Sequence, residues 1–137
     1  MAVEITGIRK SGLDMRHRHG PSEDVIYTTA PKDNGGTGEH FSPTDLLATA
    51  TGACMVTILS LWASEKGMDL GKVEYRTFKH MTSERPRRVA RLDIELQFGR
   101  CFEAATVAEM RDVALNCPVK LSLSTETEVL LEMSFAG

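Results

Sequence analysis

One segment constrains the fold more than any other, because no charged residue stands between Asp45 and Glu65. Ser42 is a favourable N-cap, Pro43 suits a first helical position, and Gly67 is a good C-cap, so a helix is expected there. Its apolar residues recur at spacings of three and four; they are Leu47, Ala50, Cys54, Ile58, Leu61 and Trp62. Small or apolar residues fill much of the remaining surface, so we expect burial on nearly all sides.

Burial on nearly all sides sets a requirement on the surroundings of this helix. A single sheet can cover only one side of it. The other sides need a second copy of the protein or a larger fold within one chain, and the second copy is the simpler solution. We therefore expect a homodimer in which two such helices bury each other, while the larger single-chain fold stays open.

The rest of the chain is typical of strands with one further helix. Short strands are expected within residues 3–29, followed by strands over 72–81, 89–98 and 127–135. The 89–98 segment alternates cleanly, which is typical of an antiparallel strand with one wet face. A second helix is expected over about 103–115. This order predicts one α+β domain over residues 1–137, with a largely antiparallel sheet, a long buried central helix and a second helix.

Charge and composition favour some partners over others. The net charge is −3 and 42% of the residues are hydrophobic, which suits a chain with a packed core and argues against general binding to nucleic acid or anionic membranes. The basic run from Arg16 to His19 is interpreted as a solvated strand end. No membrane span is expected, because no apolar run approaches the ~20 residues needed to cross a bilayer. The N-terminal residues also lack the basic start and apolar stretch of a signal peptide. A cytoplasmic location is therefore expected.

The three cysteines differ in their surroundings. Cys54 lies within the apolar helix, where a free cysteine usually packs as a small hydrophobe. Cys117 precedes Pro118 at a helix break, a position that aims a side chain and that core packing alone does not require. Cys101 is interpreted as a bystander. No close C-x-x-C pair and no histidine pairing at helical spacing is present, so neither a metal nor another cofactor is expected.

The sequence resembles the OsmC/Ohr family, the osmotically inducible and organic hydroperoxide resistance proteins. The stretch from Ser42 to Cys54 (SPTDLLATATGAC) is similar to the family signature, and the Gly35-Gly36 loop ahead of it also fits. The hairpin at 82–85 with its following strand is similar too. Cys117-Pro118-Val119 stands where the second family cysteine is expected. The resemblance covers essentially the whole chain and is closest to the OsmC-like branch.

This resemblance implies a fold and a reaction. The fold would be an intertwined homodimer with the two central helices in the interface and the cysteines at sites formed with both subunits. The reaction would be a thiol peroxidase reaction on organic hydroperoxides. Cys54, as a thiolate, would attack the peroxide and become a sulfenic acid, and Cys117 would condense with it to a disulfide. An external dithiol would then reduce the disulfide.

A thiolate at Cys54 would need a fixed positive charge. A cysteine with an ordinary pKa of ~8.5 is mostly protonated at neutral pH, burial raises that pKa, and an arginine stays charged. In the hydroperoxide resistance branch, an arginine from the N-terminal strands stabilises the thiolate, and a glutamate ten residues before the first cysteine holds that arginine. Here that position is Thr44, and Asp45 follows it. Asp45 is expected either to orient the arginine or to cap the helix through Ser42.

The arginine itself has several candidates. Arg9 resembles the arginine of the family's glycine-arginine segment, while Arg16 and Arg18 are alternatives on the next strand. The leading hypothesis is thus a peroxidase that uses Cys54, Cys117 and one of these arginines. A non-enzymatic dimer that binds a small apolar ligand or senses oxidants is the alternative. A cysteine hydrolase is a third interpretation, which lacks a histidine near either cysteine in sequence.

Overall fold

The computed structural model describes residues 1–136, which form two compact units. The first unit is Met1–Leu47 and the second is Ala48–Gly137. The α+β class predicted from the sequence is confirmed, with two separate three-stranded sheets in place of a single one. The assignment of residues 1–137 to a single domain stays a prediction.

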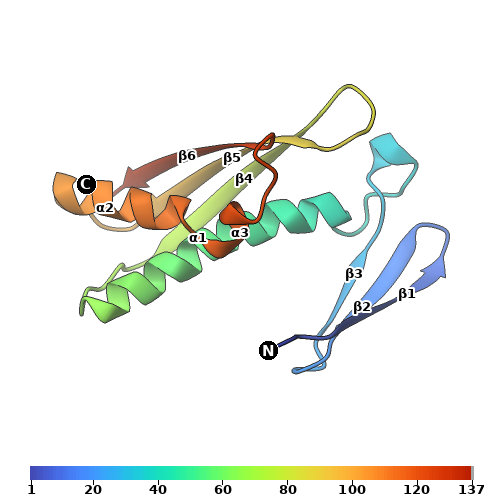
Figure 1. Ribbon diagram of the computed structural model, residues 1–137, viewed down its shortest axis with the longest axis horizontal. Coiled ribbons are helices and arrows are strands. Elements are labelled where there is room, and N and C mark those ends of the chain that lie inside the picture. The colour runs from blue at the N-terminus through green and yellow to red at the C-terminus, as the bar shows by residue number, and fades with distance from the viewer. Residues whose placement is uncertain (137) are drawn as a thin grey trace. The chain divides into compact units, whose positions relative to one another are not determined.

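The first unit is a small antiparallel sheet. Strands β1 (Ile5–Ser11), β2 (Asp14–His19) and β3 (Val25–Thr28) pair in the order β1-β2-β3 (Figure 1). Tight turns join these strands, and the short 3-10 helix η1 (Lys32–Asn34) follows. All three N-terminal strands were expected from the sequence, and β1 and β2 extend further than their apolar residues indicated.

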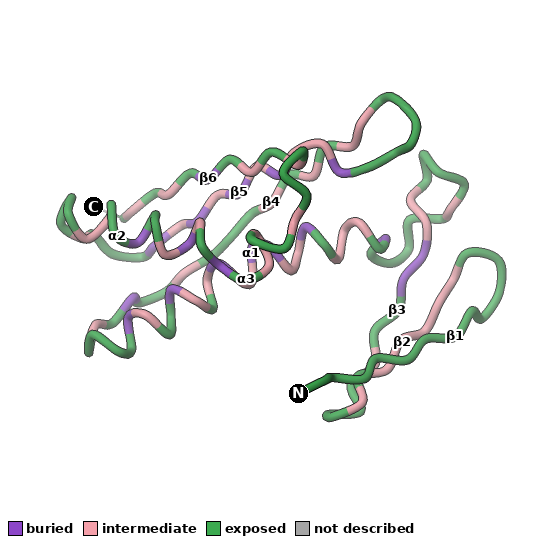
Figure 2. Tube along the Cα trace, viewed as in Figure 1, coloured by how far each residue is buried: buried purple, intermediate pink, exposed green. Residues whose placement is uncertain are grey.

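This sheet carries almost no buried side chains. Every residue of β1 is exposed, and the buried residues of the first unit are Thr28, Thr29 and Ser42 (Figure 2). Ile5 and Ile8 are 67% and 60% exposed. A three-stranded sheet needs a covered hydrophobic face to be stable on its own. Among the described residues, the first unit has no apolar core of its own.

The second unit contains the other sheet. Strands β4 (Val73–Met81) and β5 (Val89–Phe98) are antiparallel, whereas β6 (Glu128–Phe135) lies parallel to β5. The parallel pairing follows from the long connection between β5 and β6, which crosses over the sheet and contains two helices. One face of β5 is buried and supplies the centre of the core; its residues are Leu92, Ile94, Leu96 and Phe98. The predicted alternation is confirmed from Leu92 to Phe98. At the start of the strand Val89 is buried in place of the expected Ala90, because the register with β4 shifts there.

The long helix α1 (Pro43–Glu65) begins and ends where its sequence predicted. The backbone N–H of Asp45 donates to Ser42 Oγ at 3.0 Å, and the N–H of Ser42 donates to Asp45 Oδ2 at 2.9 Å. This reciprocal pair is a capping box. At the other end Gly67 has a φ of +65°, which favours glycine, and the N–H of Met68 bonds back to the carbonyl of Ala63 at 2.9 Å.

One side of α1 is buried within the single chain. The buried positions are Ala48, Thr51, Gly52, Met55, Leu59 and Ala63. The apolar positions that the sequence singled out lie on the other sides, where Leu47 and Leu61 are 36% and 57% exposed. The expected burial on nearly all sides is therefore limited to one side in the single chain.

Helix α1 also meets the length and composition criteria for a membrane span, contrary to the expectation that no run in the chain would do so. Its threonines, serines and small residues are only weakly polar, so the mean hydropathy of the whole segment stays high. Long core helices of globular domains meet the same criteria, and α1 contributes Met55 and Leu59 to the core of the second unit.

Helices α2 (Ala104–Leu115) and α3 (Pro118–Leu121) form the crossover between β5 and β6. Helix α2 buries Met110 and Ala114 in the same core as β5. The predicted interruption before Pro118 is confirmed, and the chain resumes there as a single short turn of helix.

Candidate active site

Cys117 occupies the break between α2 and α3. It is the N-cap residue of α3, with an extended backbone (φ −68°, ψ 147°), and Pro118 takes the first helical position. The N–H of Lys120 donates to Cys117 Sγ at 3.5 Å, and the side chain is completely buried. The sequence indicated the cysteine but not this amide, although a residue followed by proline at a helix start is a recognisable capping pattern.

Cys54 lies in the middle of α1 and is half-buried. Its thiol lies close enough to that of Cys117 to influence the pKa of the Cys117 thiol, so the fold brings together two cysteines that lie far apart in the sequence. Both belong to the second unit, and both are free thiols. A disulfide requires such close approach, which makes this pair the candidate redox site.

The environment of Cys117 favours its neutral form. Burial is the largest influence and raises the pKa of the Cys117 thiol above its ordinary value of 9.0. The backbone N–H groups of Lys120 and Val119 act in the opposite direction, while the neighbouring Cys54 raises the pKa further. The net shift is upward, so Cys117 carries its proton at neutral pH.

Asp45 lies at the start of α1, where it closes the capping box with Ser42. Capping was one of the two roles considered for this residue, and its hydrogen bonds are present. The other role, orienting an arginine toward Cys54, stays a prediction. One carboxylate can serve both purposes because it has two oxygens with several acceptor positions.

The two arginines proposed for the site lie on different faces of the first sheet. Arg9 pairs with Met15 across the β1–β2 ladder, whereas Arg16 pairs with Ile8. Cross-strand partners share a face and successive residues alternate, so Arg9 and Arg16 point to opposite faces. Arg18 shares the face of Arg16 and forms an ion pair with Glu23 at 2.6 Å. The participation of Arg9 or Arg16 at Cys54 stays a prediction.

Cys101 is exposed in the loop after β5. Its Sγ donates to the carbonyl oxygen of Ala136 at 2.7 Å. This contact ties the loop to the chain beyond β6. Nothing in it activates the thiol, and the interpretation of Cys101 as a bystander stands as a prediction.

Within residues 1–136, no three His, Cys, Asp or Glu side chains are grouped so that they could hold a metal ion. The histidines of β2 are engaged locally instead. His17 Nε2 lies 2.8 Å from Thr28 Oγ1, and His19 Nδ1 lies 2.6 Å from Ser22 Oγ.

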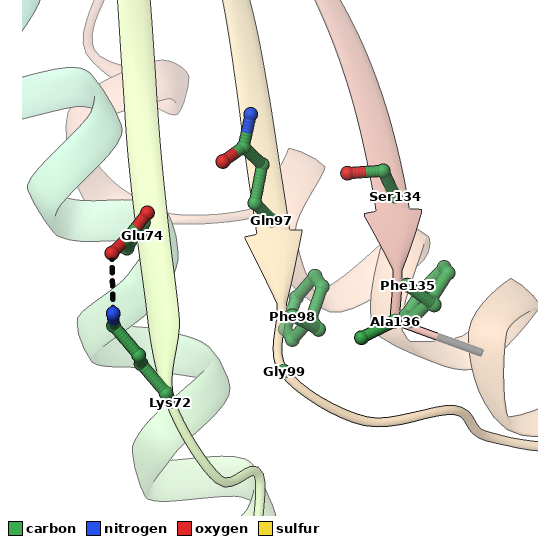
Figure 3. A pocket seen from close by; sticks show the side chains of 8 residues that line it. All are labelled: Lys72, Glu74, Gln97, Phe98, Gly99, Ser134, Phe135 and Ala136. Atoms are coloured by element: carbon green, nitrogen blue, oxygen red, sulfur yellow. Dashed lines mark ion pairs between the residues drawn. The ribbon is translucent and has the colours of Figure 1, made fainter.

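A separate hollow of about 400 Å³ lies at one end of the second sheet. Figure 3 shows its lining, which includes Glu74, Gln97 and Ser134 from three adjacent strands. Lys72 Nζ and Glu74 Oε1 form an ion pair across one side at 2.8 Å. An exposed pair of this kind contributes little energy. The hollow contains no cysteine, so the candidate active site remains the thiol pair.

Known proteins resemble the chain in sequence and in structure. The family described as OsmC-like protein matches residues 36–132. A crystal structure from Psychrobacter arcticus 273-4, named for osmotic stress induction and a detoxification response, is 32% identical with a TM-score of 0.88. The match covers 97% of this chain and 95% of that one.

More distant structures share the fold. An organic hydroperoxide resistance protein from Elizabethkingia anophelis is 15% identical, with a TM-score of 0.81 over 99% of this chain and 97% of its own. One from Legionella pneumophila is 14% identical, with a TM-score of 0.79 over 99% and 98%. No curated protein sequence matches. The family match over most of the chain, together with the Psychrobacter structure, shows that this protein belongs to the OsmC-like family.

Proposed function

We propose that this protein is a thiol-dependent peroxidase that reduces organic hydroperoxides, with Cys54 as the nucleophile and Cys117 as the resolving thiol. The observation that carries the proposal is the proximity of the two cysteine side chains, which is close enough for Cys54 to raise the pKa of the Cys117 thiol. Membership of a family that includes organic hydroperoxide resistance proteins supports the choice of substrate. Hydroperoxides are two-electron oxidants, and a pair of adjacent thiols can supply two electrons.

The first step would be attack by the Cys54 thiolate on a hydroperoxide oxygen. An S–O bond forms, the O–O bond breaks, and the departing alkoxide takes a proton to become an alcohol. Sulfur is thereby oxidised to a sulfenic acid. Cys117 is neutral at neutral pH because burial raises its pKa, so the first attack falls to Cys54.

The second step would be condensation of the two cysteines. The Cys117 sulfur attacks the sulfenic sulfur of Cys54, the S–S bond forms, and the S–O bond breaks. Hydroxide leaves and takes the Cys117 proton as water. An external dithiol then reduces the disulfide, is itself oxidised to a disulfide, and returns both cysteines to thiols.

The proposal includes an arginine that stabilises the Cys54 thiolate. Arg9 or Arg16 would supply this charge, and Asp45 would orient the guanidinium. An arginine suits the role because it stays charged at every relevant pH and offers several donors. The opposite faces of Arg9 and Arg16 in the first sheet mean that one of them, and not both, would serve.

The proposal also includes a homodimer. Two features of the single chain support it. The first unit has no buried apolar side chain among its described residues, and α1 exposes Leu47 and Leu61. A second copy would cover apolar surface that monomeric proteins rarely leave open. Light scattering should then give about twice the 15.1 kDa of one chain.

The test is turnover of cumene hydroperoxide with dithiothreitol as the reductant. Cys54→Ser is expected to abolish turnover, whereas Cys117→Ser should leave Cys54 trapped as a sulfenic acid or overoxidised, visible by intact mass. Cys101→Ser is the matched control and should turn over normally. Full activity of Cys54→Ser would exclude the mechanism. Absence of turnover in the unmodified protein would favour the non-enzymatic, ligand-binding or oxidant-sensing alternative.

A further inference from the structure

A glycine inside a long helix needs a structural reason. Gly52 lies near the middle of α1, where glycine costs about 1 kcal/mol relative to alanine. It is buried and stands two positions before Cys54. The reason for a glycine here is the close approach of α1 to the second sheet.

The space beside Gly52 is occupied by strand β4. A Cβ atom added to Gly52 would lie 2.5 Å from Cδ2 and 2.8 Å from Cε2 of the Tyr75 ring, and 2.9 Å from Thr77 Oγ1. Such separations are well inside van der Waals contact. Tyr75 and Thr77 point to the same face of β4, because their partners on β5 are the buried Leu96 and Ile94. Helix α1 therefore rests directly on this strand at Gly52.

This contact lies opposite the reactive thiol. Two steps along a helix rotate a side chain by about 200°, so Cys54 points away from the side of α1 that rests on β4. A wedge between Gly52 and Tyr75 would push α1 in the direction in which Cys54 points. Cys117 is held independently at the start of α3 by its bond to the Lys120 amide. Such a displacement changes the geometry between the two sulfur atoms.

We propose that Gly52 is a positioning residue for the thiol pair: its lack of a side chain seats α1 against Tyr75 of β4 and thereby sets the approach of Cys54 to Cys117. The inference rests on the redox role proposed for the two cysteines. Disulfide geometry tolerates only small changes, and a misplacement of about 1 Å can slow a positioned reaction by up to 100-fold. Gly52 touches neither the substrate nor the reacting sulfurs, so it acts through the helix.

The experiment measures disulfide formation without a peroxide. Diamide, a diazene, takes two electrons and both thiol protons from Cys54 and Cys117 and becomes a hydrazine, while the S–S bond forms. Loss of two hydrogen atoms is followed by intact mass in a Cys101→Ser background. Gly52→Ala is expected to form the disulfide about tenfold more slowly. Its disulfide should also be reduced at a lower ratio of reduced to oxidised dithiothreitol, because strain makes a disulfide more reducible.

A second substitution separates positioning from general damage. Tyr75→Ala removes the surface against which an alanine at 52 would press, so the double variant should recover to the rate of Tyr75→Ala alone. Tyr75→Ala by itself should slow disulfide formation about threefold, because α1 loses the ring against which it packs. If Gly52→Ala does not fold, the Tyr75→Ala variant alone tests the positioning role. Ser64→Ala, exposed on the same helix, is the control and should react like the parent protein.

The outcomes distinguish this inference from the proposed function. A parent protein that forms no Cys54–Cys117 disulfide with diamide would overturn both. If the parent protein forms the disulfide, and Gly52→Ala forms it at the same rate and with the same reduction equilibrium, the positioning role alone would be overturned. A slow Gly52→Ala that Tyr75→Ala does not rescue would also overturn it. Slowing by Gly52→Ala with recovery in the double variant would support it.

Discussion

The two units of the chain differ in how they use apolar residues. In the second unit, Ile94 of β5 is 1% exposed and lies in a core shared by a sheet and two long helices. In the first unit, Ile8 of β1 is 60% exposed on a sheet without a buried apolar residue. The thiol pair lies in the unit that has the core. A reactive pair needs rigid support, which a packed core provides and an uncovered three-stranded sheet does not.

Substituting the same residue type in both units tests this contrast with the largest expected effect. Ile94→Ala should lower the free energy of unfolding by about 2–5 kcal/mol, because it removes a fully buried side chain and leaves a cavity. Ile8→Ala should change it by less than about 0.5 kcal/mol, as exposed positions usually do. Chemical denaturation of both variants measures the two values.

An equal cost for the two isoleucines would contradict the contrast between the units. A large cost for Ile8→Ala that grows with protein concentration would instead sharpen it, because it would show that a second copy covers β1.

The arginines of the first unit provide the next largest effect. Because Arg9 and Arg16 lie on opposite faces of their sheet, only one of Arg9→Ala and Arg16→Ala should slow peroxide reduction, by about tenfold or more. The loss corresponds to at least about 1.4 kcal/mol of transition-state stabilisation. Stopped-flow kinetics with excess hydroperoxide measure it. Equal slowing in both variants would rule out a single activating arginine.

The start of α1, which the first unit contributes, should have a smaller effect. Ser42→Ala removes the hydroxyl that accepts from the Asp45 amide and should cost about 1 kcal/mol of stability. Urea denaturation at a fixed protein concentration measures the change. A cost near zero would mean that the capping box contributes nothing beyond what water can replace.

The second unit also contains a buried polar atom without a hydrogen-bond partner among the described residues. This atom is Thr77 Oγ1, which lies beside Gly52. Thr77→Val keeps the shape and removes the unpaired hydroxyl, so it should raise the free energy of unfolding by up to about 1 kcal/mol. A destabilised valine variant, judged by its thermal midpoint, would reveal a partner for that hydroxyl.

The smallest effect concerns the solvent face of the second sheet. Burial acts to raise the pKa of Asp93, but hydrogen bonds and charges from His80 and Arg91 outweigh it and hold the pKa below its usual 3.8. A lowered carboxyl pKa adds stability above the unfolded-state value, and this is lost as the pH falls through the folded-state value. The stability advantage over Asp93→Asn should therefore be present above about pH 4 and shrink below it. An advantage independent of pH would contradict this.

Much of the fold follows from local patterns in the sequence. The strand at 89–98 alternates so regularly that its bounds, and its buried face from Leu92 onward, could be predicted. Ser42 and Gly67 mark the ends of α1 through backbone chemistry that acts over a few residues. The parallel direction of β6 could not be predicted, because a strand carries no sequence signal for the direction of its partner. The buried side of α1 was also missed, since a helix that is apolar on most sides has little periodicity.

The site shows the same division. The proline beside Cys117 indicated a special position, and the family resemblance linked it to Cys54. The Lys120 amide at the Cys117 sulfur is a local capping contact that the Cys117-Pro118 pattern could have indicated. The contact of Gly52 with Tyr75 could not be inferred, because it depends on how two separate elements meet in space. The choice between Arg9 and Arg16 depends on strand register, which Met15 and Ile8 define only once the strands are paired.

The parallel pairing of β5 with β6 also bears on how fast the chain folds. Leu92 lies beside Val129 in that register, with both crossover helices in the loop between them. Closing such a loop costs entropy before any contact repays it, whereas the hairpins of the first sheet close over a few residues. The hairpins should form quickly and dissolve just as quickly, and the slow step should be the arrival of β6. Because Cys117 lies within the crossover, the two thiols should meet late in folding.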